Sequence, residues 1–140
     1  MRILALDVGT KTIGVAVSDE FGIAAHGVTT IKRTDLKRDL EALSKIIDQY
    51  KPSEILVGVP YNYDGTVSKR GEEILKFAEK IKTTFSLPVE YWDESFSTVE
   101  AEKLLLEADL SRKKRKKVID KMAAIFILEG YLDKKRMERT

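Results

Sequence analysis

Residues 2–18 read Arg-Ile-Leu-Ala-Leu-Asp-Val-Gly-Thr-Lys-Thr-Ile-Gly-Val-Ala-Val-Ser, and this stretch decides the fold. It contains a short β-rich run that ends at Asp7 and a second, alternating run that begins at Thr12. The turn between the runs carries Gly9, so the pattern predicts two strands joined by a glycine-bearing turn. A third strand is expected within residues 23–31. Together these runs predict a three-stranded antiparallel meander.

Downstream of the meander, the apolar residues change to helical spacing. The first helix is expected to start from an N-cap at Thr34 and to stop at Lys51-Pro52. Residues 55–59 read Ile-Leu-Val-Gly-Val, a continuous apolar run typical of a strand buried on both faces of a parallel sheet. A second helix is predicted from the apolar residues at helical spacing between 74 and 85.

The rest of the chain predicts one more strand and two helices. Residues 89–93 have the character of a strand. Ser97 and Glu100 form a capping box, which predicts a short helix to about residue 108. A final helix is expected over roughly residues 114–135. The predicted order of elements is therefore β-β-β-α-β-α-β-α-α.

This order defines an α/β fold. Helices between the later strands imply right-handed parallel crossovers, which place these strands on one sheet with the first strand. The expected architecture is a five-stranded mixed sheet, with three antiparallel strands, then two parallel strands, and helices on both faces. A chain of 140 residues is expected to form a single domain over residues 1–140.

Composition restricts the class of protein. The chain has no cysteine, which excludes disulfides and thiolate chemistry. Its 43% hydrophobic and 34% charged residues are typical of a globular, soluble protein rather than a disordered one. No apolar stretch approaches the roughly 20 residues that span a bilayer, and the N-terminus enters an apparent strand at once. We therefore expect a cytoplasmic protein with no membrane partner.

Three acidic residues, Asp7, Glu94 and Asp120, lie where an apolar segment ends or turns polar. Asp7 and Glu94 follow predicted strands whose carboxyl ends share one edge of the sheet, where open α/β sheets place their sites. Asp120 lies on the final helix, among residues that face or flank the core. Taken singly, an Asp after a strand is more often a turn former.

Carboxylates that converge on one point repel one another unless a divalent cation compensates their charge. Magnesium prefers such oxygen ligands. Two magnesium ions can activate a water and stabilise the leaving oxygen of a phosphodiester, without a His or Cys nucleophile. If the three acids converge, the sequence predicts a hydrolytic magnesium site.

Basic and aromatic residues near this edge are candidates for binding nucleic acid, although the net charge is only +2. Lys11 lies in the first turn, and Lys69 and Arg70 open the second helix, where backbone amides and positive charge favour a phosphate. Tyr61 follows the fourth strand and could stack on bases, with packing of its loop as the alternative. A basic run before Asp120 is interpreted as phosphate-binding or as a solvated helix start. Its residues are Arg112, Lys113, Lys114, Arg115, Lys116 and Lys117.

Residues 7–14 also support a different interpretation, because a tight glycine-containing hairpin after an Asp can cradle phosphates through backbone amides. The stretch resembles the first phosphate loop of actin- and sugar-kinase-type ATPases. Those proteins bind nucleotide between two such domains, whereas this chain has residues for one. Nucleotide binding therefore ranks last among the hypotheses.

Several motifs resemble one known family over nearly the whole chain. They include Leu6-Asp7-Val8-Gly9, Gly58-Val59-Pro60, Asp93-Glu94 and Ile119-Asp120. In these motifs the chain is similar to the YqgF or RuvX family of ribonuclease-H-like proteins, described both as Holliday junction resolvases and as pre-16S rRNA nucleases.

The resemblance implies a catalytic set of Asp7, Glu94 and Asp120 that binds Mg²⁺, with Mn²⁺ as an alternative ion. Family members usually read Asp-Glu-Arg before a Thr-Thr pair. Here Ser95 replaces the Arg and Ser97 replaces the first Thr. A phosphate contact of that Arg is therefore not carried over to this chain.

The leading functional hypothesis is a magnesium-dependent nuclease of structured nucleic acid, which processes the 5′ end of pre-16S rRNA in ribosome biogenesis. The alternatives are a Holliday junction resolvase acting on branched DNA and a non-catalytic nucleic-acid-binding module. The sequence leaves RNA and DNA substrates open, because backbone contacts carry little sequence information. It also leaves monomer and homodimer open, although paired cuts in a junction normally need a symmetric dimer.

Overall fold

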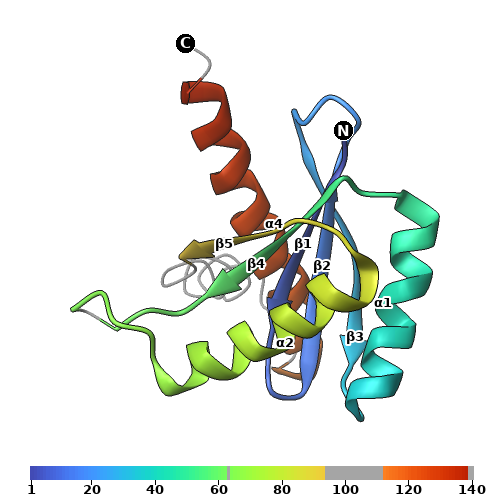
Figure 1. Cartoon of the computed structure of the whole chain (residues 1–140), viewed down its shortest axis with the longest axis vertical. Helices are drawn as coiled ribbons and strands as arrows, with labels where there is room; N and C mark the ends of the chain where they lie inside the picture. The colour runs from blue at the N-terminus through green and yellow to red at the C-terminus, as the bar shows by residue number, and fades with distance from the viewer. Residues whose placement is uncertain (63, 94–111, 139–140) are drawn as a thin grey trace.

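The computed structural model describes residues 1–62, 64–93 and 112–138, and for residues 112–120 it describes the backbone alone. One mixed sheet of five strands, in the order β3-β2-β1-β4-β5, forms its centre (Figure 1). β1 pairs antiparallel with β2, and β2 with β3, whereas β1–β4 and β4–β5 are parallel pairs. The predicted mixed sheet is confirmed. Its strands are β1 (Ile3–Val8), β2 (Thr12–Ser18), β3 (Ala25–Lys32), β4 (Glu54–Val59) and β5 (Val89–Asp93).

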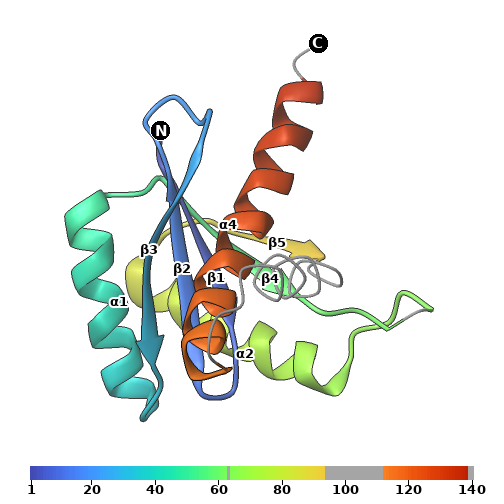
Figure 2. The ribbon, with the colours of Figure 1, turned by 180° about the vertical axis from the view of Figure 1, so that it is seen from behind.

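Helices cover both faces of the sheet, as predicted. α1 (Leu36–Tyr50) and α2 (Lys69–Phe85) lie on one face, and α4 (Arg112–Glu138) lies on the other (Figures 1 and 2). α4 extends a few residues beyond the predicted bounds at both ends. The predicted short helix after Ser97 falls outside the described residues. None of the described helices is long and apolar enough to cross a membrane.

The predicted N-cap of α1, Thr34, is wrong by one residue. Asp35 caps the helix, and its carboxylate accepts a hydrogen bond from the Arg38 amide at 2.9 Å. Thr34 instead donates its backbone N–H to the buried carboxylate of Asp39, at 3.1 Å. The helix therefore begins after Asp35, and the local contact between Thr34 and Asp39 joins the residue before the cap to the first turn.

Alternation along the strands creates two cores, one on each face. Leu6 and Val8 of β1 belong to the core beneath α1 and α2, whereas Ala5 belongs to the core beneath α4. The α4 core includes three small residues, Ala5, Ala16 and Ala124, all fully buried. These short side chains let α4 lie close to the first strands of the sheet.

A compact turn joins β2 to β3. The Asp19 carboxylate accepts hydrogen bonds from the backbone N–H groups of Phe21 (3.0 Å), Ile23 (2.9 Å) and Ala24 (3.0 Å). The turn closes through the Gly22 amide, which donates to the Asp19 carbonyl, and Gly22 has a φ of 69°, which favours glycine. One carboxylate thus holds the whole turn in place.

These hydrogen bonds predict a pH-dependent stability. They lower the pKa of Asp19, the Ile23 N–H most strongly, because they favour the ionised carboxylate. The stabilisation is therefore present above the unfolded pKa, about 3.8, and is lost as the pH falls through the lower folded value. We expect Asp19→Ala to lower the urea midpoint at neutral pH, and the difference from wild type to shrink below about pH 4. A difference that stays constant down to pH 2 would contradict this role.

Candidate functional site at the carboxyl edge of the sheet

The three parallel strands end at one edge of the sheet. Asp7 is the second-last residue of β1, and Asp93 is the last residue of β5. Pro60 follows the last residue of β4. This edge is where the sequence predicts the site, because ligands of open α/β sheets bind outside the carboxyl ends of the strands.

Asp7 lies half-buried on the α4 face of the sheet. Leu6 and Val8, its neighbours in β1, point into the core beneath α1 and α2. Because side chains alternate along a strand, Asp7 shares the opposite face with Ala5. A carboxylate thus continues a row of otherwise apolar side chains.

Two glycines flank Asp7 on the neighbouring strands. Gly14 of β2 is its partner in the antiparallel register. On the other side, the parallel register pairs Leu6 with Val57, so that Asp7 and Gly58 each follow that pair by one residue. By strand alternation both glycines lie on the α4 face. The positions directly beside Asp7 on both adjacent strands therefore carry no side chain.

Sequence reasoning missed the importance of these glycines. The signal was available, because a glycine inside a strand often marks a site where a ligand or another backbone approaches closely. It could not be used without the register that places both Gly14 and Gly58 beside Asp7.

α4 crosses this face antiparallel to β1. Leu132, near its C-terminal end, lies beside Ile3 at the start of β1, so that the helix begins toward the carboxyl edge (Figures 1 and 2). Gly130 packs against Trp92 of β5, and a Cβ atom there would lie 3.0 Å from the indole ring. Trp92 also meets the Tyr131 ring edge to face, with centroids 6.1 Å apart. These contacts fix the position of α4 over the sheet.

The structure gives no side-chain position for the other two predicted acids, Glu94 and Asp120. Glu94 lies outside the described residues and directly follows Asp93 in the chain. Asp120 lies in α4, four residues before the buried Ala124, and its side chain is not described. No group of three His, Asp or Glu side chains that could hold a metal occurs in the described part of the chain. Convergence of the three carboxylates stays a prediction.

Two arginines hold the β1–β2 turn next to Asp7. The Arg70 Nη2 donates to the Val8 carbonyl at 2.8 Å, and the Arg33 Nη1 donates to the Gly9 carbonyl, also at 2.8 Å. Gly9 is required at this position because a Cβ atom would lie 2.9 Å from the Thr12 carbonyl oxygen. The turn is therefore anchored at two successive carbonyls, by the residue that follows β3 and by a residue of α2.

Arg33 is itself held by a buried acid. Its Nε lies 3.2 Å from the Oδ2 of Asp39, whose side chain is 3% exposed. The guanidinium also stacks over Phe77, with its central carbon 4.8 Å from the ring centroid. A hollow of about 340 Å³ opens beside both arginines. It is lined by Thr10, Arg33, Thr34, Asp35, Leu36, Asp39, Arg70 and Glu73.

The basic residues predicted to contact nucleic acid differ in whether their side chains are already engaged within the chain. Lys11 and Lys69 are exposed, as a phosphate contact requires. The guanidinium of Arg70 is engaged within the chain, with the Val8 carbonyl and with Glu73 at 2.9 Å. The basic run from Arg112 to Lys117 forms the first turns of α4, and its side chains are not described.

Tyr61 packs in its own loop. It is half-buried against the core beneath α1 and α2, and it forms an isolated bridge with Val67. Ser68, at the end of the loop, ties the start of α2 to the residue that follows β4. Its hydroxyl donates to the Pro60 carbonyl at 3.1 Å and accepts from the Gly71 amide at 2.9 Å. The structure thus documents the packing role of Tyr61, whereas base stacking stays a prediction.

The fold is that of the ribonuclease-H-like resolvases. Thermus thermophilus RuvC, solved in complex with a Holliday junction substrate, superposes with a TM-score of 0.59 at 15% identity, over 96% of this chain and 96% of that chain. At this identity the likeness concerns the fold alone.

Sequence comparison identifies one family within this fold class. The family model "RuvX: Holliday junction resolvase" matches residues 1–134. A "Putative pre-16S rRNA nuclease" of Desulforamulus reducens is 56% identical over 133 residues, 95% of this chain and 97% of the relative. A protein of the same name from Clostridium kluyveri is 55% identical over 134 residues, 96% of this chain and 98% of the relative. The chain belongs to the RuvX family.

Proposed function

We propose that this chain is a magnesium-dependent nuclease, folded as a single domain, which processes the 5′ end of pre-16S rRNA during ribosome assembly. Membership of the RuvX family and the shared name of its relatives support a hydrolase acting on phosphodiester bonds. The single observation that carries the proposal is the position of Asp7. It is the second-last residue of a central strand, at the carboxyl edge, with a glycine opposite it on each neighbouring strand.

The residues around Asp7 fit a divalent cation. Asp7 offers carboxylate oxygens, the ligands that magnesium prefers, between the glycine positions of β2 and β4. We propose that Glu94 and Asp120 complete the ligand set. Magnesium bound there would supply an activated water and stabilise the leaving oxygen of the phosphodiester. The anchored β1–β2 turn keeps Asp7 in register while substrate binds.

Phosphate binding is assigned to the basic residues that border the same edge. Lys11, Lys69 and the run that starts α4 are proposed to contact the backbone of the nucleic acid, with Arg70 at their margin. Such contacts release counterions, so the affinity for RNA should fall steeply as salt rises. They carry little sequence information, and the shape of the structured precursor would select the cleavage position.

One cleavage screen tests the proposal. Precursor 16S rRNA ends and a four-way DNA junction are incubated with the protein under matched magnesium, with a chelator in parallel. We expect cleavage at the rRNA 5′ end, dependent on magnesium or manganese, and none with the chelator. Binding of both substrates without cleavage under any divalent ion would instead support a non-catalytic binding module.

A second candidate, resolution of branched DNA, is favoured by the description of the matching family model. It requires two cuts placed symmetrically across the junction and hence a dimer with both sites on one junction. Paired cleavage of the four-way DNA in the same screen, with intact precursor rRNA, would favour the resolvase.

A further inference from the structure

The end of the molecule opposite the candidate site exposes apolar side chains on a hydrogen-bonded turn. Phe21 is 80% exposed and Ile23 is 60% exposed, and both belong to the turn that the Asp19 carboxylate holds. Met1, 86% exposed, lies at the same end of the sheet. Single exposed apolar residues are common, but a cluster displayed by an ordered turn is typical of an interaction site.

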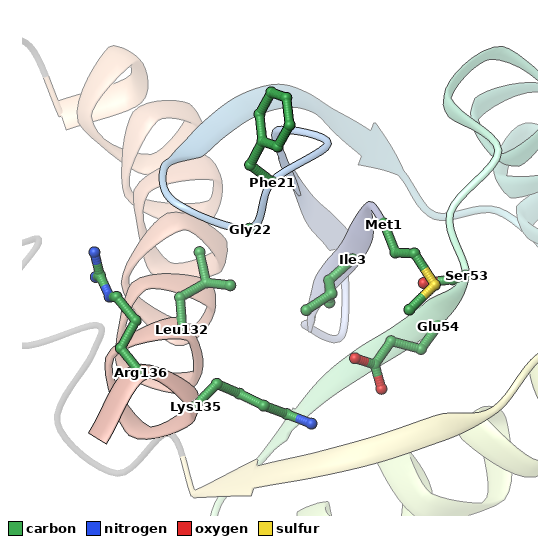
Figure 3. A pocket seen from close by; sticks show the side chains of 9 residues that line it. All are labelled: Met1, Ile3, Phe21, Gly22, Ser53, Glu54, Leu132, Lys135 and Arg136. Atoms are coloured by element: carbon green, nitrogen blue, oxygen red, sulfur yellow. The ribbon is translucent and has the colours of Figure 1, made fainter. Parts of the chain in front are cut away.

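A hollow of about 160 Å³ lies beside this turn (Figure 3). We call it the Leu132 hollow. Its lining residues are Met1, Ile3, Phe21, Gly22, Ser53, Glu54, Leu132, Lys135 and Arg136. Leu132 and Ile3 approach it from α4 and β1, whereas the ring of Phe21 stands at its rim and points away from it (Figure 3). The chain's own aromatic ring therefore does not fill the space.

The volume of the Leu132 hollow suits one aromatic ring. An apolar cavity of about 150 Å³ is large enough to bind benzene. The walls formed by Ile3, Gly22 and Leu132 offer apolar contact to such a ring. A phenyl group from outside the chain would thus bury its apolar surface there.

The turn carries an exposed acid, and the hollow is lined by more basic than acidic side chains. Glu20, an exposed acid, directly precedes Phe21 in the turn. Lys135 and Arg136, both exposed, line the Leu132 hollow together with Glu54, and Arg136 also pairs with Asp133 (Figure 3). A turn that inserts its aromatic ring into this hollow and carries an acid beside it would therefore meet two basic side chains. The Phe21 turn of a second copy has both features.

We propose that two copies of this chain associate through this surface, with a two-fold axis, so that each Phe21 ring enters the Leu132 hollow of the other copy. In such a symmetric interface the same patch serves both partners, and Glu20 of each copy lies near Lys135 and Arg136 of the other. The apolar patch is small, so the dimer belongs with weak interfaces. Because the surface lies at the amino ends of the parallel strands, both candidate sites face away from the contact.

Sedimentation equilibrium of the full chain tests this association, over concentrations from about 1 μM to 1 mM, the range in which weak dimers dissociate. We expect the average mass to rise from one copy toward two. Phe21→Ser should remove this rise, whereas Leu36→Ser, at an exposed position on α1, should leave it unchanged. A wild-type chain that keeps the mass of one copy at every concentration would overturn the proposal.

Charge reversal provides a second, complementary test. Glu20→Lys makes both the turn and the rim basic, and the double variant Lys135→Glu/Arg136→Glu makes both acidic, so neither variant should self-associate. An equimolar mixture should form a mixed dimer, because each turn then meets a rim of opposite charge. Folding of each variant is checked by circular dichroism. A mixture that stays at the mass of one copy, when both variants are folded, would contradict the proposed pairing.

Discussion

Replacing Asp7 by asparagine is expected to lower the rate of RNA cleavage about a thousand-fold, which corresponds to roughly 4 kcal/mol of transition-state stabilisation. The substitution keeps the shape of the side chain and removes the negative charge that a divalent cation needs. Affinity for the uncleaved RNA should change by no more than about twofold, because the proposed phosphate contacts lie on other residues. Single-turnover cleavage and a filter-binding titration measure the two quantities.

A matched control separates the site from general charge effects. Asp48→Asn makes the same chemical change at an exposed position on α1 and should leave cleavage unchanged. If Asp7→Asn cleaves as fast as wild type, Asp7 has no part in the reaction. If both variants lose activity equally, the loss reflects net charge and the proposed metal site is not supported.

The largest loss of stability is expected from Arg33→Met. This change removes the partner of Asp39, whose side chain is 3% exposed, and it removes the hydrogen bond to the Gly9 carbonyl. An uncompensated buried carboxylate costs about 3 kcal/mol, at the lower end of measured values because Thr34 still donates to it. In a chain of this size the loss lowers Tm by about 10 °C. Thermal unfolding followed by circular dichroism measures it.

Two further variants identify the cause. Arg38→Met makes the same substitution at a surface pair with Asp35, 3.7 Å apart, where the arginine side chain is 74% exposed, and should cost less than about 0.5 kcal/mol. The double variant Arg33→Met/Asp39→Leu should recover most of the lost stability, because it leaves no buried charge without a partner. A double variant less stable than Arg33→Met would show that the carboxylate is not the source of the loss.

The sheet was predictable because its strands have distinct local patterns. The alternating run after Thr12 and the continuous apolar run before Pro60 indicated an antiparallel and a buried parallel strand, and both are confirmed. The N-cap of α1 was predicted one residue early, because Thr34 and Asp35 are both favoured N-cap residues and only the structure shows that the Asp35 carboxylate accepts from the Arg38 amide. Local patterns therefore predicted the elements better than their boundaries.

The sequence predicted only the part of the candidate site that lies at the end of a described strand. Asp7 lies at the expected edge, whereas Glu94 and Asp120 stay predictions. The role of Arg33 could not be predicted, because it donates to Gly9, a residue 24 positions away that only the β1–β2–β3 register brings near. The position of Gly14 and Gly58 beside Asp7 likewise could not be predicted without the strand register.

The position of α4 has a consequence for synthesis on the ribosome. Ile3, Ala5 and Ala16 are translated early, but the helix that buries them follows all five strands in the chain. A nascent chain that has completed its sheet therefore still presents one bare apolar face, the kind of surface that aggregates or recruits chaperones. Asp7 and Asp120, proposed to act together, also emerge more than a hundred residues apart. An unfinished chain should thus hold no working nuclease centre while it is still attached to the translating ribosome.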